Sequence, residues 1–361
     1  MKEIIIIADS DPRKKVSGGV GVYSYNLTKL LLKKGYKIIF IGKRHEGDII
    51  FMHDHLEFIE LNKKPWQSNY VFLKNLFKLS RNLKINVGTI IHSQRPDWLV
   101  PFRNFPNKKI ITLHGSHSKN VLLKKGFFIK KLYDKLEEKG LQIADSIVSV
   151  SDENTLHYKK MYPKLASKIF TIPVGIDIER FKNLDKLKSR RRYGFEKNDK
   201  VVIYAGRLEK EKNLKLLIDA CNDLNLKLLI IGNGREEKNL KEYAKKLNSR
   251  TYFHDSVDNA EMPRVLACGN VFGLTSLHEG LPTVVIEAIA CGLPVVSTDV
   301  GDIRKLVIEN KTGFIVDEEN IRERLKILIG KNSINKKKSS EIVKKYSWDN
   351  VGNEIIGVYE K

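Results

Sequence analysis

The stretch VFGLTSLHEGLPTVVIEAIACGLPVVS, at residues 271–297, has the pattern of a strand, a loop, a helix and a second strand. Its first four residues suit a short buried strand, Gly280 provides a turn, and Pro282 suits the first turn of a helix. A second short apolar run follows at Pro294–Ser297. Two short apolar strands joined by a helix form a βαβ unit, so this stretch predicts a parallel sheet with helices packed against it.

The same alternation of short apolar runs and amphipathic stretches continues along the chain, and the predicted fold class is therefore α/β. In the first half, the predicted strands are Ile4–Ala8, Lys37–Ile41, Gly88–His92, Lys109–Leu113 and Ser146–Val150. In the second half, they are Val201–Ala205, Lys227–Ile231, Val271–Leu274 and Pro294–Ser297.

A chain of 361 residues exceeds the usual size of one hydrophobic core, so two domains are expected. The segment IPVGID at residues 172–177 has the proline and glycine of a connection. We therefore predict an N-terminal domain at residues 1–172 and a C-terminal domain at residues 173–345. The tail, residues 346–361, is predicted to form a helix with one apolar face that returns to the N-terminal domain.

Composition limits the class of protein. The three cysteines are widely spaced and include no CxxC pair, which favours a reducing cytosol. No apolar run approaches the roughly 18 residues of a membrane span, and no signal peptide is recognisable, so a cytoplasmic protein is expected.

The net charge of +22 lies mostly in the first half, where residues 1–170 hold 31 Lys and Arg against 15 Asp and Glu. This excess of positive charge in the first half of the chain suggests an anionic partner. Nucleic acid is not expected, because no nucleic-acid-binding signature is present. Peripheral contact with an anionic membrane is one alternative, since apolar residues recur at helical spacing among lysines and arginines, although a core-facing helix explains them as well. These apolar residues are Trp66, Tyr70, Leu73, Leu76, Phe77 and Leu83.

Two carboxylates flank the predicted start of the helix after Gly280. Glu279 lies in the loop and Glu287 in the second helical turn, and the first backbone N–H groups, those of Thr283 and Val284, favour a phosphate. Carboxylates repel bare phosphate but accept hydrogen bonds from sugar hydroxyls. A nucleotide sugar has both kinds of group, so this pattern predicts a nucleotide-sugar site.

This segment resembles the E-x7-E signature of the family-four retaining glycosyltransferases, whose GT-B fold has two facing Rossmann-like domains with parallel sheets and an interdomain cleft. The resemblance implies that Glu279 contacts the transferred sugar and that Glu287 binds the ribose hydroxyls. It also implies that the diphosphate is held at the helix start, by Gly280, Leu281, Pro282, Thr283 and Val284.

A second segment, VVIYAGRLEKEKN at residues 201–213, is similar to the G-R-x4-K element of the same family. It ends a predicted strand with Gly206, and cations at the carboxyl edge of a parallel sheet face the ligand crevice. The resemblance implies that Arg207 and Lys212 clamp the diphosphate and neutralise it as the leaving group.

Further matches extend over nearly the whole chain. Gly18 and Gly19 lie in a loop similar to the Gly-Gly loop of the family, where a missing side chain lets the ligand approach. His114 matches the histidine that touches the donor sugar, and Gly232 matches a glycine turn on the nucleotide side. The chain departs from the family at residues 301–305, where GDIRK replaces a Gly-Gly pair and a later Glu.

The resemblance implies a metal-independent enzyme without a cofactor, which transfers a hexosyl or N-acetylhexosaminyl group with retention from a UDP-, GDP- or ADP-sugar. The acceptor would be a hydroxyl of a glycan or glycolipid, in the synthesis of cell-surface polysaccharide, glycolipid or lipid-linked oligosaccharide. No protein nucleophile is needed, because stabilisation of the leaving group and orientation of the acceptor carry the reaction.

Four alternatives remain at this point. Asp9-Ser10-Asp11 is a D-x-D after a strand, as in metal-dependent glycosyltransferases, but Arg207 and Lys212 already supply the charge of a metal. A nicotinamide-dependent oxidoreductase is the second alternative. It lacks support, because Ser24 stands where the G-x-G-x-x-G dinucleotide-binding fingerprint has its third glycine. A sugar-nucleotide 2-epimerase of the same fold and a non-catalytic nucleotide-sugar-binding protein are the other two.

Overall fold

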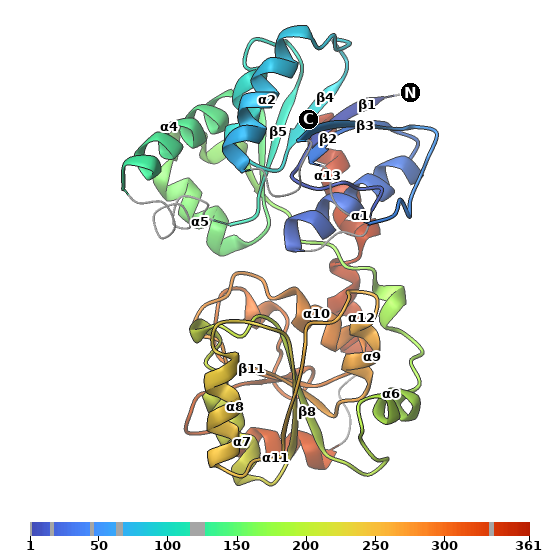
Figure 1. Ribbon diagram of the computed structural model, residues 1–361, viewed down its shortest axis with the longest axis vertical. Helices are drawn as coiled ribbons and strands as arrows, with labels where there is room; N and C mark the ends of the chain where they lie inside the picture. Colours follow the sequence, from blue (N-terminus) through green and yellow to red (C-terminus); the bar gives the residue numbers. More distant parts are fainter. Residues whose placement is uncertain (1, 15–17, 44–46, 63–67, 116–126, 332–335) are drawn as a thin grey trace. The chain divides into compact units, whose positions relative to one another are not determined.

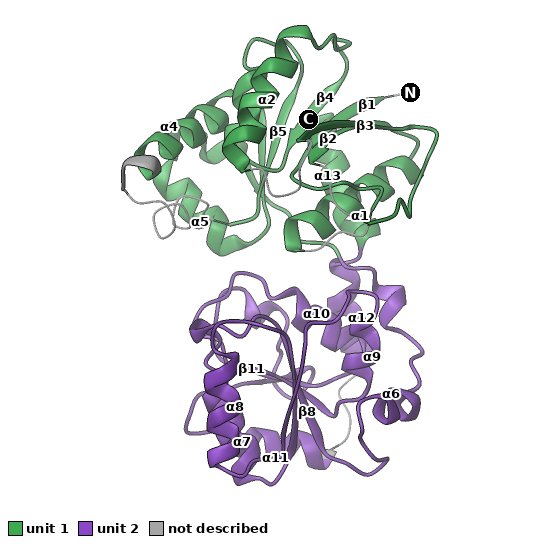
Figure 2. Cartoon of the chain, in the orientation of Figure 1, with its two compact units in different colours: residues 1–175, 348–361 green, residues 176–347 purple. Residues whose placement is uncertain are grey.

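The computed structural model describes residues 2–14, 18–43, 47–62, 68–115, 127–331 and 336–361. The chain forms two compact units, which Figure 2 shows in different colours. The N-terminal unit comprises Met1–Gly175 and Trp348–Lys361, and the C-terminal unit comprises Ile176–Ser347. The first boundary, at 175/176, lies three residues after the predicted one at 172/173. The second, at 347/348, lies two residues after the predicted one at 345/346.

The N-terminal unit contains a seven-stranded sheet in which every paired strand is parallel, in the order β3-β2-β1-β4-β5-β6-β7. The strands are β1 (Glu3–Ile7), β2 (Lys37–Lys43), β3 (Leu56–Asn62), β4 (Ile90–Ser93), β5 (Lys109–Leu113), β6 (Ser146–Ser149) and β7 (Ile169–Thr171).

The isoleucine side chains of β1 pack on both faces of this sheet. Ile4 and Ile6 pack in a cluster with α1 (Gly19–Lys33) and α13 (Trp348–Glu360), whereas Ile5 and Ile7 pack in a second cluster with α2 (Asn69–Asn82) and η1 (Asp97–Phe102). Successive side chains of a strand point to opposite faces, so a central strand covered on both sides is apolar throughout. Also in this unit are α4 (Phe127–Ile143), α5 (Asp152–Met161) and η2 (Pro163–Lys168).

The C-terminal helix α13 belongs to the N-terminal unit and packs against α1, as Figure 1 shows. Val351, Ile355 and Val358 form its buried face. Gly352 lies so close to α1 that a β-carbon there would come 2.2 Å from a methyl of Leu30. The predicted return of the tail is therefore present, with the predicted residues inward.

Four of the six apolar residues predicted between positions 66 and 83 face the core. Leu73 and Leu76 are buried in the cluster below α2, and Phe77 and Leu83 pack against its edge. Tyr70 is exposed, and Trp66 lies outside the described residues. The stripe therefore gives no support to an interfacial helix. Within the described ranges, no helix is both long and apolar enough to cross a membrane.

The C-terminal unit contains a six-stranded parallel sheet in the order β10-β9-β8-β11-β12-β13. The strands are β8 (Val201–Ala205), β9 (Lys227–Ile231), β10 (Thr251–His254), β11 (Val271–Leu274), β12 (Val295–Ser297) and β13 (Gly313–Ile315). The helices are η3 (Ile178–Phe181), α6 (Lys186–Arg192), η4 (Lys210–Lys212), α7 (Leu214–Asp223), α8 (Glu237–Lys246), α9 (Met262–Ala267), α10 (Thr283–Ala290), η5 (Ile303–Lys305), α11 (Ile321–Lys331) and α12 (Lys336–Lys345).

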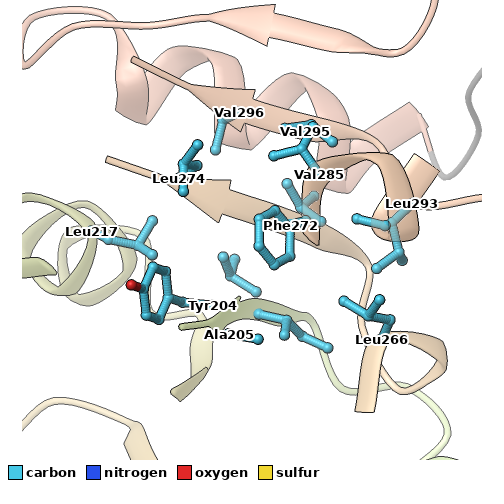
Figure 3. Packing of buried hydrophobic residues seen from close by; sticks show 14 of the residues in the cluster. Tyr204, Ala205, Leu217, Leu266, Phe272, Leu274, Val285, Leu293, Val295 and Val296 are labelled. Atoms are coloured by element: carbon cyan, nitrogen blue, oxygen red, sulfur yellow. The ribbon is translucent and has the colours of Figure 1, made fainter. Parts of the chain in front are cut away.

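One hydrophobic core supports the loops at the carboxyl ends of β8 and β11. Figure 3 shows Tyr204 of β8, Phe272 of β11 and Val285 of α10 in this cluster, with Val295 and Val296 of β12. Because these side chains are buried and close-packed, the strands and α10 present their ends at fixed positions.

Four strands were not predicted from the sequence: β3, β7, β10 and β13. They are the two edges of each sheet. An edge strand has one unpaired side, and these four are short or half-exposed, so the apolar run that marks a central strand is broken.

The buried His92 makes the stability of the N-terminal unit dependent on pH. Its Nδ1 lies 2.7 Å from the Tyr359 hydroxyl of α13, its Nε2 lies 2.8 Å from Thr112 Oγ1, and burial lowers its pKa from 6.5 to about 3. Between these values the unfolded state binds more protons, so the free energy of unfolding falls as pH decreases from 6.5 towards 3. The expected slope from this group is about 1.4 kcal/mol per pH unit.

All three tryptophans, Trp66, Trp98 and Trp348, lie in this unit, so their fluorescence during urea unfolding at pH 7 and pH 5 measures the effect. His92→Asn should be less stable at pH 7 but lose less stability on acidification than the wild type. The matched control is His53→Asn, at an exposed position. Equal acid sensitivity of His92→Asn and the wild type would contradict this assignment.

Candidate functional site

The loops after β8 and β11 meet at the point where the order of the C-terminal sheet reverses. From β8 the chain moves outward through β9 to β10, and from β11 it moves the other way through β12 to β13. Loops diverge at such a point and leave a crevice at the carboxyl ends of the strands, which is where open α/β sheets bind ligands. The predicted donor residues of this unit follow β8, β9 and β11.

An ion pair joins the two loops. Lys212 Nζ, at the end of η4, lies 2.7 Å from Glu279 Oε1, in the loop after β11, and the two side chains are only 13% and 17% exposed. Ser276 Oγ donates a second hydrogen bond of 2.7 Å to the same carboxylate oxygen. The predicted leaving-group cation and the predicted sugar-binding carboxylate are therefore in direct contact.

Backbone hydrogen bonds fix this contact. The Leu277 N–H donates to the Glu211 carbonyl at 2.8 Å, and Thr275 Oγ1 donates to the carbonyls of Lys212 and Asn213 at 3.2 and 3.1 Å. Asn213 has a left-handed backbone with φ of 46°, which Asn tolerates better than most residues. The positions of Lys212 and Glu279 thus depend on main-chain bonds and not only on their side chains.

The loop after β12, where the sequence departs from the family pattern, packs on the site. The Asp302 N–H donates to the Gly280 carbonyl at 2.9 Å. Gly301 has φ of 50°, and a β-carbon there would lie 2.1 Å from the Gly280 oxygen. A glycine is therefore required at 301 for the loop to support Glu279 and Gly280.

Helix α10 begins beside Glu279 without a side-chain cap. Pro282 is its N-cap residue, and the Val285 N–H is bonded to the Pro282 carbonyl at 3.0 Å. The preceding N–H groups, of Thr283 and Val284, have no intrahelical acceptor by helix geometry. They lie at the positive end of the helix dipole, as a phosphate site requires.

Glu287 lies one turn further along α10 and is partly buried. Burial raises its pKa to about 7, and the Arg180 charge on η3 opposes that rise. Among the described residues, no hydrogen bond or ion pair to its carboxylate is found. A carboxylate without a protein partner in such a place can accept hydrogen bonds from ligand hydroxyls.

Arg207 and the glycine turns lie in the same unit, but Arg207 does not join the ion pair. Its side chain is 72% exposed, and its nearest carboxylate is Glu211, at 3.6 Å. The buried Tyr204 hydroxyl donates to the Arg207 carbonyl at 3.0 Å. Gly232, with φ of 139°, touches Gly206: a β-carbon at 232 would lie 1.9 Å from the Gly206 oxygen. The loops after β8 and β9 therefore need glycine where they meet.

The remaining predicted residues lie in the N-terminal unit. Gly18 is the N-cap residue of α1 and Gly19 its first residue; both are exposed, and β-carbons there would meet nothing. His114 directly follows β5, with its Nε2 2.8 Å from Gln94 Oε1 and its ring against Tyr23. All three are at carboxyl ends of strands or at a helix start, as a ligand-facing position requires.

The structure gives the D-x-D motif a different role. The Asp11 carboxylate accepts hydrogen bonds from the Arg13 N–H, Nε and Nη2 at 2.9–3.0 Å, and Asp9 Oδ2 lies 3.9 Å from Lys43 Nζ. Both carboxylates thus have basic neighbours, which is the wrong chemistry for a cation site. No group of three metal-binding side chains occurs in the described part of the chain.

Three residues that act on the predicted ones were not predicted from the sequence. Ser276 contacts Glu279, Glu211 contacts Arg207, and the charge of Arg180 acts on Glu287. Ser276 and Glu211 lie in the sequence segments that carry the two main motifs. Their short distance in sequence from Glu279 and Arg207 is the signal that could have identified them. Arg180 lies in the connection after Gly175, more than 100 residues from Glu287, and no local pattern indicates that its charge lowers the pKa of that carboxylate.

Comparisons with known proteins cover both units. Residues 17–180 match the family described as Glycosyltransferase Family 4, and residues 185–346 match the family described as Glycosyl transferases group 1. An uncharacterized glycosyltransferase of Methanocaldococcus jannaschii is 27% identical over 275 residues, covering 74% of this chain and 60% of that protein. A phosphatidyl-myo-inositol mannosyltransferase of Mycobacterium leprae is 28% identical over 210 residues, covering 54% of each protein.

Solved structures match over the whole chain. Sucrose-phosphate synthase from Thermosynechococcus elongatus has a TM-score of 0.82 at 20% identity, covering 100% of this chain and 98% of that one. Anabaena HepE in complex with UDP and glucose has a TM-score of 0.76 at 17% identity, covering all of both chains. These matches establish the two-domain GT-B fold. The chain belongs to the family-four glycosyltransferases, the glycosyl transferases group 1.

Proposed function

We propose that this glycosyltransferase moves a sugar, with retention of the anomeric configuration, from a nucleotide-diphosphate sugar to an acceptor hydroxyl. The observation that carries the proposal is the contact of Lys212 with Glu279 beside the uncapped start of α10. This arrangement offers a cation and N–H donors for a diphosphate and a carboxylate for the adjacent sugar, and Glu287 offers a second carboxylate for the ribose.

In the proposed reaction, Lys212 stabilises the leaving group. An ammonium group has three N–H donors, so Lys212 can bind a phosphate oxygen while keeping its bond to Glu279. The bond between the anomeric carbon and the phosphate oxygen breaks, and a bond to the acceptor oxygen forms on the same face. The acceptor proton passes to the departing phosphate. The charge that develops on the diphosphate is then met by Lys212, Arg207 and the helix start.

The other predicted residues have supporting roles in this proposal. His114 contacts the transferred sugar, Gly18 and Gly19 let the ligand approach α1, and Gly206, Gly232 and Gly280 keep the loops free of side chains. Arg207 turns from solvent towards the diphosphate, and its exposure leaves it free to do so. The cations replace a metal ion, so the proposed reaction needs neither a metal nor a cofactor.

The proposed substrates are a UDP-, GDP- or ADP-sugar carrying a hexosyl or N-acetylhexosaminyl group and a glycan or glycolipid acceptor. The UDP and glucose bound to HepE support such a donor, and the mannosyltransferase named for phosphatidyl-myo-inositol supports a lipid-linked acceptor. We place the protein in the cytoplasm, where it contributes to cell-surface polysaccharide, glycolipid or lipid-linked oligosaccharide synthesis. Its basic N-terminal half supports contact with an anionic membrane there.

A donor panel tests this proposal. The protein is melted in EDTA with UDP-, GDP- and ADP-sugars, and one of them should raise the Tm as expected of a ligand that binds only the folded state. Incubation with that donor should then release the nucleoside diphosphate and free sugar slowly, and faster with an acceptor. Conversion of the donor into its 2-epimer would instead identify an epimerase. Binding of the donor without turnover would identify a non-catalytic nucleotide-sugar-binding protein. Activity that appears only after Mn²⁺ is added would contradict the metal-free mechanism.

Substitution of Lys212 tests the leaving-group assignment. Lys212→Ala should lower kcat by about 10²-fold, because the charge it meets grows as the diphosphate departs. Lys210→Ala is the matched control, since this exposed lysine lies on the same turn and should leave kcat within about twofold. Steady-state kinetics at saturating donor and acceptor compare the two, with circular dichroism to confirm folding. A kcat that is unchanged in Lys212→Ala would remove the assignment.

The pKa of Glu287 predicts a pH dependence of donor binding. With a pKa of about 7, the carboxylate becomes protonated as pH falls and loses an acceptor site for ribose hydroxyls. The Kd for the nucleotide sugar should therefore rise by up to about tenfold between pH 8 and pH 6, and stay constant above pH 8. Nucleotide sugars suit this test because their diphosphates do not titrate in that range.

The variants Glu287→Gln and Glu242→Gln separate this carboxylate from general pH effects. Glu287→Gln should bind more weakly at pH 8 and show an almost flat profile, whereas Glu242→Gln, at an exposed position on α8, should keep the wild-type profile. Calorimetric titration measures each Kd. A wild-type profile in Glu287→Gln would show that another group causes the pH dependence.

A further inference from the structure

A second ion pair accompanies the one between Lys212 and Glu279. Arg207 Nη2 lies 3.6 Å from Glu211 Oε1, and both residues belong to the segment between β8 and α7. Each of the two cations assigned to the diphosphate therefore has a carboxylate of its own: Glu279 for Lys212, and Glu211 for Arg207. Glu279 is assigned to the transferred sugar, whereas the proposed reaction gives Glu211 no role.

The backbone that carries Arg207 and Glu211 is anchored at both residues. The hydroxyl of the buried Tyr204 donates to the Arg207 carbonyl at 3.0 Å. The Leu277 N–H, from the loop after β11, donates to the Glu211 carbonyl at 2.8 Å. Between these two points, Leu208 is fully buried in the hydrophobic core. A rearrangement of the pair can therefore take place in its side chains alone.

The Tyr204 hydroxyl lies among the charges of the donor site. Burial raises the pKa of Tyr204 above its usual value, and the charge of Glu279 adds to this rise. The charge of Arg207 lowers the same pKa, and that of Glu211 raises it. Charges have such effects on groups close to them. Glu211 and the carboxylate assigned to the sugar therefore lie near the same hydroxyl.

The two ion pairs differ in how easily they open. Lys212 and Glu279 are only 13% and 17% exposed, and their charged atoms are 2.7 Å apart. The side chains of Arg207 and Glu211 are 72% and 45% exposed, and their separation of 3.6 Å is beyond hydrogen-bond length. Because water screens an exposed pair, its net strength is small. Arg207 can thus exchange Glu211 for a diphosphate at little cost.

The nucleotide product of the proposed reaction carries more charge than the donor. A terminal phosphate has a second pKa of about 6, so above that pH the nucleoside diphosphate gains a negative charge when its sugar is removed. Arg207 and Lys212 then attract the product more strongly than they attract the donor. A carboxylate beside Arg207 competes for that cation and opposes the retention of the product.

We propose that Glu211 is the anion that Arg207 binds in place of the diphosphate, and that this exchange speeds release of the nucleoside diphosphate. Glu211 is a positioning residue, because it acts through Arg207. The inference rests on the proposed function, since it describes how the product leaves the same site. Its signature is a gain of affinity when the Glu211 charge is removed, which a damaged or partly unfolded variant would not show.

Calorimetric titration of the full chain with UDP, GDP and ADP tests this role. The titrations are made at pH 8, where Glu287 is ionised because its pKa is about 7. Glu211→Gln should lower the Kd of the nucleoside diphosphate that the wild type binds by about three- to fivefold, as expected for loss of an exposed competing ion pair. Stopped-flow displacement should show that the dissociation rate falls by a similar factor.

A double-mutant cycle shows whether the effect depends on Arg207. In the Arg207→Gln background, Glu211→Gln should change the Kd by less than about twofold, because the cation for which Glu211 competes is absent. Glu209→Gln is the matched control, since it removes the same charge from the same segment, two residues from Glu211. It should leave the Kd within about twofold of the wild-type value.

Three outcomes would overturn the inference: an unchanged Kd in Glu211→Gln, equal tightening by Glu211→Gln in the Arg207→Gln background, or equal tightening by Glu209→Gln. The last two would show that Glu211 acts only as one more negative charge near the nucleotide. A wild type that binds none of the three nucleotides would overturn the proposed function together with this inference. A wild type that binds one of them, without an effect of Glu211→Gln, would remove this inference alone.

Discussion

The ion pair between Lys212 and Glu279 is the interaction on which the site of the C-terminal unit depends. It joins the loops after β8 and β11, two strands that are neighbours in the sheet but nearly 70 residues apart in the chain. A pair this shielded from water is screened less than a surface pair, and the Ser276 hydroxyl and the main-chain bonds of Leu277 and Thr275 hold its geometry. A preorganised cation of this kind can meet developing charge without reorganising at the moment of reaction.

Glycines make this arrangement sterically possible. Gly232 against Gly206, and Gly301 against Gly280, bring neighbouring loops within van der Waals contact of each other's carbonyl oxygens. Any β-carbon at Gly232 or Gly301 would push these loops apart and displace the residues they carry. Both also have positive φ, which a side chain disfavours. The Gly301 loop thus supports Glu279 through its backbone, although its sequence differs from the family pattern.

The two units share one arrangement of their parallel sheets. In each, a parallel sheet reverses its strand order beside its first strand, and polar side chains collect at the carboxyl ends there. In the C-terminal unit these are a cation, carboxylates and a helix start, which suit a diphosphate and its sugar. In the N-terminal unit they are Asp9, Ser10, Lys43 and Gln94.

The sequence by itself determined the α/β class, the two domains, the central strands and the main site motifs, because buried central strands and glycine-bounded loops leave local patterns. The edge strands β3, β7, β10 and β13 left none, since half-exposed strands take mixed sequences. Only the tertiary structure decided that Lys212 bonds Glu279, that Arg207 lies outside this ion pair, and that Leu73 and Leu76 face the core. Each of these depends on which distant segments are brought side by side, and local periodicity carries no information about that.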